Sequence, residues 1–166
     1  TSDPNAVVTI AGGTAIITGD PPVAPLQNNI IMSPVSPPEG MPCPDLTITN
    51  VSQDPDLAPG VYCYHNINIS GGGSLTTNDT GSVTVFLTGS FSASGNTVVG
   101  VQGNPTQFLM VLTSTALEVT LQGDLTGSTE FYGGIYAPTG EVNIAGSAEV
   151  FGSVVAGRWG ALRLIL

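Results

Sequence analysis

Few residues in this sequence could carry out acid–base chemistry. Asp54 and Asp56 are the closest pair of acids, but they lie in Gln53-Asp54-Pro55-Asp56, a turn-like segment in which carboxylates usually cap the backbone or face solvent. His65 is the single histidine, and no acid adjoins it in the sequence. General acid–base catalysis needs partners within hydrogen-bond reach. We therefore expect His65 to be a polar residue of the fold and the protein not to be an enzyme.

Cys43 and Cys63 are the only cysteines, and two cysteines without a metal-ligand pattern favour a disulfide. The bond would close a loop of about twenty residues and stabilise the fold by roughly 3 kcal/mol in the chain-entropy interpretation. It would also indicate an oxidising, extracellular setting. The alternative is a pair of buried free thiols in a cytosolic protein.

The sequence predicts no cofactor, since it has no phosphate-binding loop and no cysteine–histidine metal motif. Calcium is the one alternative. Asn78-Asp79-Thr80-Gly81 and Gly123-Asp124 could offer oxygen ligands, although no dense array of aspartates surrounds them.

One short phrase recurs along the chain that must position these residues: apolar, small polar, apolar, small, glycine, small. Self-similarity of this kind is typical of repeat architectures. Neighbouring copies in the second half of the chain start 23 to 28 residues apart. A longer phrase, residues 130–137, recurs 19 residues later as residues 149–156. The copies of the short phrase begin at Val8, Ile67, Phe91, Val119 and Val142.

The apolar residues of each phrase alternate with Thr, Asn or Ser, which is the two-residue period of a strand with one buried face. The glycine then ends the strand at a tight corner. A unit this short cannot bury its own apolar face and must stack on its neighbours. The sequence thus predicts an all-β, single-domain β-solenoid, a parallel β-helix with coils of roughly 19–28 residues. The alternative is a β-sandwich, which also consists of short strands between turns.

The expected organisation is one domain over residues 1–166, with three parts. Residues 1–20 would form the first coil. Residues 21–56 would form an extended excursion along the side of the solenoid, because its many prolines exclude a regular helix and a central strand. Residues 57–166 would form the main coils, and the disulfide would attach the excursion to them.

The composition of the chain disfavours some kinds of binding partner. The net charge is −10 and the only basic residues are Arg158 and Arg163, which disfavours nucleic acid and anionic membrane surfaces. No apolar run reaches the roughly 18 residues of a membrane span. With 8% charged and 41% hydrophobic residues, the chain is unlike a disordered tail. We expect an exported protein at the cell surface or outside the cell.

The stretch Leu57-Ala58-Pro59-Gly60-Val61-Tyr62-Cys63, followed by Ile67-Asn68-Ile69-Ser70-Gly71-Gly72, resembles the glycine-rich solenoid region of Tad-type and PilX-like pilus-assembly proteins. Those proteins combine a Pro-Gly-Val-Tyr-Cys phrase, an upstream segment rich in proline and cysteine, and repeated glycine-ended coils. The resemblance extends over about residues 43–157. It implies a non-enzymatic, exported β-solenoid associated with a pilus or the envelope.

The order of the Pro-Gly-Val-Tyr phrase and the closing Gly-x-Ile-x-Ala and Gly-x-Val-x-Ala coils is also similar to the ice-binding β-solenoids of microbes. That resemblance implies a flat face of small groups that orders water. Asn and Gln interrupt the threonine pattern such a face should have, and small outward residues also suit any tightly coiled solenoid. The candidate flat face consists of Thr9, Asn68, Ser92, Thr120 and Asn143.

The C-terminal residues predict a contact between copies. An apolar strand at the end of a solenoid exposes an edge that can template another chain. We therefore expect a self-associating building block of a filament or pilus-like assembly. The alternatives are an ice-binding protein and a carbohydrate-binding adhesin, for which Tyr62, Tyr64 and Trp159 would line a groove. The candidate assembly edge consists of Leu162, Leu164, Ile165 and Leu166.

Overall fold

The fold is taken from a computed structural model, which describes residues 7–10, 13–16, 33, 35–78, 80–113, 118–122 and 128–159. Side chains are described within 33–113 and 128–157. The chain divides into two compact units, Thr1–Met32 and Ser33–Leu166. Each unit has its own sheet.

The smaller unit contains a hairpin in place of the coil expected over residues 1–20. β1 (Val7–Ile10) pairs antiparallel with β2 (Gly13–Ile16), and Thr9 lies opposite Thr14. Only two residues separate the strands, and a two-residue connection suits a tight hairpin. The phrase at Val8 therefore forms a strand, as predicted, but Thr9 does not join the solenoid column to which the sequence assigned it.

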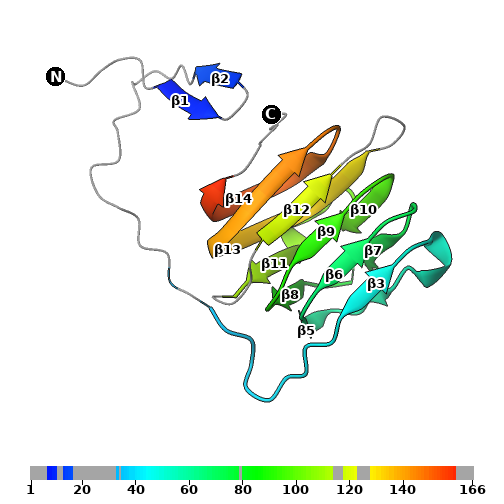
Figure 1. The fold of residues 1–166 in the computed structure, drawn as a ribbon. Coiled ribbons are helices and arrows are strands. Elements are labelled where there is room, and N and C mark those ends of the chain that lie inside the picture. The colour runs from blue at the N-terminus through cyan, green and yellow to red at the C-terminus, as the bar shows by residue number, and fades with distance from the viewer. Residues whose placement is uncertain are drawn as a thin grey trace. The chain divides into compact units, whose positions relative to one another are not determined.

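The larger unit is a parallel β-helix, which confirms the predicted fold class (Figure 1). Its strands form three faces, and β13 (Thr129–Ala145) and β14 (Glu149–Trp159) bend around the corners. Face A consists of β3 (Leu46–Ile48), β6 (Ile67–Ile69), β9 (Phe91–Ala93), β12 (Glu118–Gln122) and residues 141–145 of β13. Face B consists of β5 (Gly60–Tyr64), β8 (Val83–Leu87), β11 (Phe108–Leu112), residues 134–137 of β13 and 153–156 of β14. Face C consists of β4 (Asp56–Leu57), β7 (Ser74–Thr77), β10 (Thr97–Gly100), residues 129–132 of β13 and 149–152 of β14.

The repeats in the sequence are the strand register of the helix. Ile67, Phe91, Val119 and Val142 lie on neighbouring strands of face A and are cross-strand partners in that order. The 19-residue repeat is likewise a register, since residues 130–137 pair one for one with residues 149–156. Each copy of a phrase is therefore one turn of the β-helix. The first to fifth turns are residues 46–64, 67–87, 91–112, 118–137 and 141–156.

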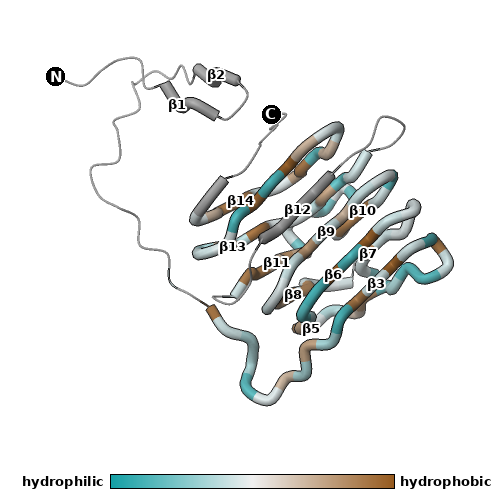
Figure 2. Tube along the Cα trace, viewed as in Figure 1, coloured by the Kyte–Doolittle hydropathy of each residue, from teal (hydrophilic) through white to brown (hydrophobic). Residues whose placement is uncertain are grey.

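Apolar and polar residues alternate along many of the strands (Figure 2), and the apolar side chains of all three faces are buried in a shared core. Phe91, Phe108 and Phe131 come from faces A, B and C, and each is at most 1% exposed. The Phe131 ring meets the other two edge to face, with ring centroids 6.4 Å from Phe91 and 5.7 Å from Phe108. Burying one such side chain contributes about 1.5–3 kcal/mol. The three aromatic side chains thus hold the three faces together at the middle of the helix.

The β-helix begins earlier than the sequence predicts. β3 and β4 lie within the expected excursion of residues 21–56, yet they pair in parallel with β6 and β7. The 3-10 helix η1 (Val51–Gln53) joins the two short strands, and the side chain of Asn50 caps its start. Among the described residues just upstream, Ser33 and 35–45, there is no strand, as their prolines predict. Residues 21–32 lie outside the described part of the chain.

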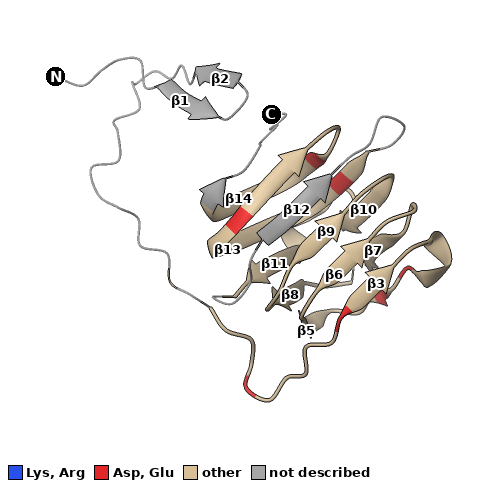
Figure 3. Ribbon diagram, viewed as in Figure 1, with Lys and Arg blue, Asp and Glu red and all other residues tan. Residues whose placement is uncertain are grey.

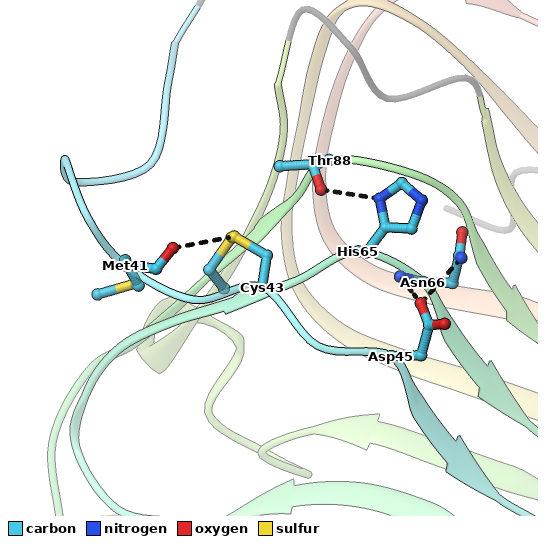
Figure 4. Close-up of a disulfide and its surroundings, with 7 residues drawn as sticks. Met41, Cys43, Asp45, His65, Asn66 and Thr88 are labelled. Atoms are coloured by element: carbon cyan, nitrogen blue, oxygen red, sulfur yellow. Dashed lines mark hydrogen bonds between the residues drawn. A yellow bond between two sulfur atoms is a disulfide. The ribbon is translucent and has the colours of Figure 1, made fainter.

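The described residues before β3, Ser33 and residues 35–45, form an irregular strap attached to face B at two points. The disulfide joins Cys43 to Cys63 of the first turn, as predicted, with 4.7 Å between the Cα atoms (Figure 4). At the other end, the Tyr136 hydroxyl of the fourth turn donates a hydrogen bond to the Ser33 carbonyl, at 2.8 Å. The strap therefore connects turns that are far apart along the helix axis.

Candidate functional site

Face A carries the small polar residues that the sequence proposed as a flat face. Asn68 pairs with Ser92, Ser92 with Thr120, and Thr120 with Asn143. The first turn adds Thr47, opposite Asn68, which the sequence analysis missed because it expected no coil there. We call Thr47, Asn68, Ser92, Thr120 and Asn143 the small-polar column. Neighbouring strands lie about 4.8 Å apart, so the column repeats at that spacing.

The column is accessible in its described members. Thr47 and Asn68 are exposed, and Ser92 and Asn143 are half-buried. Atom Oδ1 of Asn143 is buried and has no hydrogen-bond partner among the described residues. None of the side chains of the small-polar column is charged, so the column can order water or contact another uncharged surface.

A ladder of hydrogen bonds fixes the corner beside this face. Asp45 Oδ1 accepts from the Asn66 backbone N–H at 3.0 Å and from Asn66 Nδ2 at 2.9 Å (Figure 4). Asn66 Oδ1 in turn accepts from the backbone N–H and the hydroxyl of Ser90, both at 3.0 Å. Polar side chains thus link the first three turns at this edge of face A, which favours a rigid corner there.

The residues considered for acid–base chemistry, His65, Asp54 and Asp56, have different local surroundings. His65 is exposed, and its Nδ1 lies 3.0 Å from the Thr88 hydroxyl (Figure 4). Asp54 Oδ1 accepts from the Ser74 backbone N–H at 2.6 Å, while Asp56 is exposed on β4. Within the described residues, the acidic positions are spread over the ribbon (Figure 3), with Glu130 and Glu149 as cross-strand partners, and no group of three His, Cys, Asp or Glu side chains could hold a metal ion. These residues act locally, in turns and between neighbouring strands.

Two of the aromatic residues expected to line a groove serve the fold instead. Tyr62 and Tyr64 are half-buried and pack against the core, and the Tyr62 hydroxyl donates to the Ala58 carbonyl at 2.8 Å. Burial raises the pKa of Tyr64 above its usual value. The side chain of Trp159 and the residues of the candidate assembly edge, 162 and 164–166, lie outside the described residues.

The sequence analysis missed an aromatic pair on face C. Tyr132 and Phe151 are cross-strand partners whose rings stack with centroids 4.6 Å apart and planes 9° apart. The Tyr132 hydroxyl donates to Glu130 Oε2 at 2.8 Å. Burial, reinforced by this bond, raises the pKa of Tyr132, so the phenol stays protonated and keeps donating. The 19-residue repeat already aligned the two rings and could have revealed the pair.

Residues 49–161 match the family described as a domain of unknown function, DUF7305. The chain belongs to this family. The match begins at the end of β3 and finishes just after β14, so the family unit is the β-helix and not the N-terminal hairpin. No curated protein and no solved structure matches the chain. Among the described residues no helix is long and apolar enough to cross a bilayer.

Proposed function

We propose that this chain is a non-enzymatic structural protein of the cell surface or the extracellular space, a β-helix that associates with further copies of itself in a filament or pilus-like assembly. The observation that carries the proposal is the outer edge of β14, which no other described strand pairs with. This strand spans Glu149–Trp159 and pairs with β13 only, among the described strands. Its free backbone groups can continue the parallel ladder or pair with another strand.

The two ends of the β-helix differ in a way that favours association through the last turn. In the first turn, β3 and β4 have only three and two residues, with η1 between them, while β5 has five. Asp54 lies just before β4, and Asp56 is its first residue. Short strands and charges protect a sheet edge. The last turn has a long strand with two exposed apolar side chains, Phe151 and Val155. The disulfide fits an oxidising compartment and supports export.

The test is the size of the purified protein over a concentration series, by light scattering with negative-stain microscopy. The wild type should form oligomers or filaments that grow with concentration. Val155→Lys places a charge on the last turn, where Val155 is 44% exposed, and should weaken assembly. Val61→Lys, on the first turn at 48% exposure, is the matched control. If both variants weaken assembly, copies stack head to tail; if only the first does, last turns pair. A wild type that stays monomeric throughout refutes the proposal.

Ice binding is the second candidate, and the in-register small-polar column favours it. Ser92→Tyr would interrupt the column with a bulky ring, whereas Thr84→Tyr puts the same ring at a half-buried outward position of face B. If face A binds ice, the wild type and the Thr84 variant should show thermal hysteresis and the Ser92 variant should lose it. Absence of hysteresis in the wild type would eliminate this candidate.

A further inference from the structure

A cleft of about 240 Å³ lies at the corner between faces C and B. It exists because that corner differs between turns. In the third turn, residues 101–107 bulge outward and include the 3-10 helix η2 (Pro105–Gln107). In the fourth and fifth turns, β13 and β14 pass the same corner without a loop. The resulting step is lined by Pro105, Thr106, Gly133, Gly134, Gly152 and Ser153.

The floor of the cleft is bare backbone, and the packing requires it to be so. A Cβ atom at Gly152 would lie 2.0 Å from the carbonyl oxygen of Gly133, and one at Gly133 would lie 2.6 Å from the carbonyl oxygen of Phe108. Both glycines therefore keep the turns in contact. Their lack of side chains also leaves backbone surface accessible beside η2.

The stacked aromatic pair adjoins this floor, since Tyr132 precedes Gly133 and Phe151 precedes Gly152. Tyr132 is 8% exposed, but Phe151 on the last turn is 41% exposed. Tyr132 covers one face of the Phe151 ring, at a centroid distance of 4.6 Å. An aromatic ring that is stacked on one side and exposed beside a cleft offers a flat apolar surface to a ligand.

Polar side chains lie near the Tyr132–Phe151 pair on face C. Glu130 and Glu149 are cross-strand partners, and Glu130 accepts from the Tyr132 hydroxyl. Gln102 Nε2 lies 3.4 Å from the same hydroxyl. Ionised carboxylates only accept hydrogen bonds, so the complementary ligand must bring donors such as hydroxyl groups. With a net charge of −10, the protein repels anionic ligands.

We propose that the surface of face C beside this cleft binds a neutral saccharide, with the C–H face of one pyranose ring on Phe151 and hydroxyl groups donating to Glu149 and Glu130. A pyranose with equatorial hydroxyls has the required combination of an apolar face and donors around its rim. The proposal goes beyond the assembly function and does not depend on it. Phe151 also lies on the last turn, so a saccharide on its ring and a second copy at that edge would compete.

Calorimetric titration of the full chain with cellopentaose and N-acetylchitopentaose tests the proposal, with tri-galacturonic acid as the anionic comparison. At least one neutral oligosaccharide should bind and the anionic one should not. Phe151→Ala should weaken binding by about tenfold, the loss expected for an aromatic contact. Phe151→Trp should retain binding, and Val155→Ala, an equally exposed apolar truncation on the same strand, should leave affinity unchanged.

Circular dichroism of each variant establishes that it folds, and the titrations are run at a concentration where light scattering has fixed the oligomeric state. Absence of binding by both neutral oligosaccharides overturns the saccharide proposal and leaves the assembly result intact. Equal affinity of wild type and Phe151→Ala, or tightest binding to the anionic sugar, also overturns it.

Discussion

Replacing Gly100 by alanine, and comparing the result with Gly103→Ala, tests whether the β-helix needs glycine at position 100 because neighbouring turns pack closely there, and not only because of its positive φ. Gly100 ends β10 with φ +90°, and Gly103, in the bulge that follows, has φ +82°. A Cβ at Gly100 would lie 1.9 Å from the Tyr132 carbonyl oxygen, whereas a Cβ at Gly103 would meet no atom within 4 Å. Both substitutions force an alanine into a backbone conformation with positive φ, but only Gly100→Ala also creates a steric clash.

The expected magnitudes follow from these contacts. An alanine forced to positive φ costs about 1–2 kcal/mol, offset in part by the lower entropy of its unfolded chain. Gly103→Ala should thus lower the free energy of unfolding by about 1 kcal/mol. In Gly100→Ala the Tyr132 carbonyl must move by about 1 Å or more, which disrupts the β10–β13 ladder. Losing one or two buried hydrogen bonds at about 1 kcal/mol each raises the total to about 3 kcal/mol.

Urea unfolding followed by circular dichroism measures both values, provided that the slope m stays constant across the variants. Gly100→Ala should shift the midpoint two to three times further than Gly103→Ala. Equal shifts would mean that β10 and β13 can separate without cost, and would refute the view that close stacking of turns at this corner stabilises the helix.

Three further results are expected. Replacing Cys43 and Cys63 together by serine should lower the free energy of unfolding by about 3 kcal/mol; reductant should reproduce the loss in the wild type and leave the melting temperature of the double variant unchanged. Phe131→Ala should cost about 3–5 kcal/mol, because it removes the ring that meets both other core phenylalanines, while Val155→Ala should stay within about 0.5 kcal/mol in urea unfolding. Because the pKa of Tyr132 is raised, its contribution to stability is present below about pH 10 and is lost as the pH rises through the folded-state pKa. Melting temperatures between pH 8 and 11.5 should therefore fall on the alkaline side, and Tyr132→Phe should reduce that slope; an unchanged slope would contradict the pKa shift.

Much of the β-helix was predictable because its repeats are local. The alternation in Ile67-Asn68-Ile69 decides which side chains are buried, and the recurrence of that phrase decides which strands lie side by side. The recurrence of residues 130–137 predicted the pairing of β13 with β14 residue for residue. The disulfide was also predictable, since the chain has no other cysteine to compete for either partner.

The partner of an isolated strand was not predictable from its pattern. The phrase at Val8 has the same alternation as the later copies, yet β1 pairs with β2 because a two-residue loop brings that strand close first. The sequence analysis also placed the start of the solenoid too late, because the first strand of the β-helix does not carry the full phrase. Leu46-Thr47-Ile48 alternates as the later copies do, but Thr49-Asn50 follows it in place of a small residue and a glycine, and its hydrogen-bonded neighbour β6 identifies it as part of a turn of the helix.

The sequence by itself determined the class of fold, the register of the turns and the disulfide, because each follows from residue type and spacing along the chain. Only the tertiary structure decided what the surfaces contain. The stack of Tyr132 on Phe151 and the glycine-floored cleft depend on how the corner of one turn differs from the corners of the next two. These features depend on contacts between neighbouring turns. The residues concerned are 19 to 30 positions apart in the sequence and become neighbours only when the chain has folded.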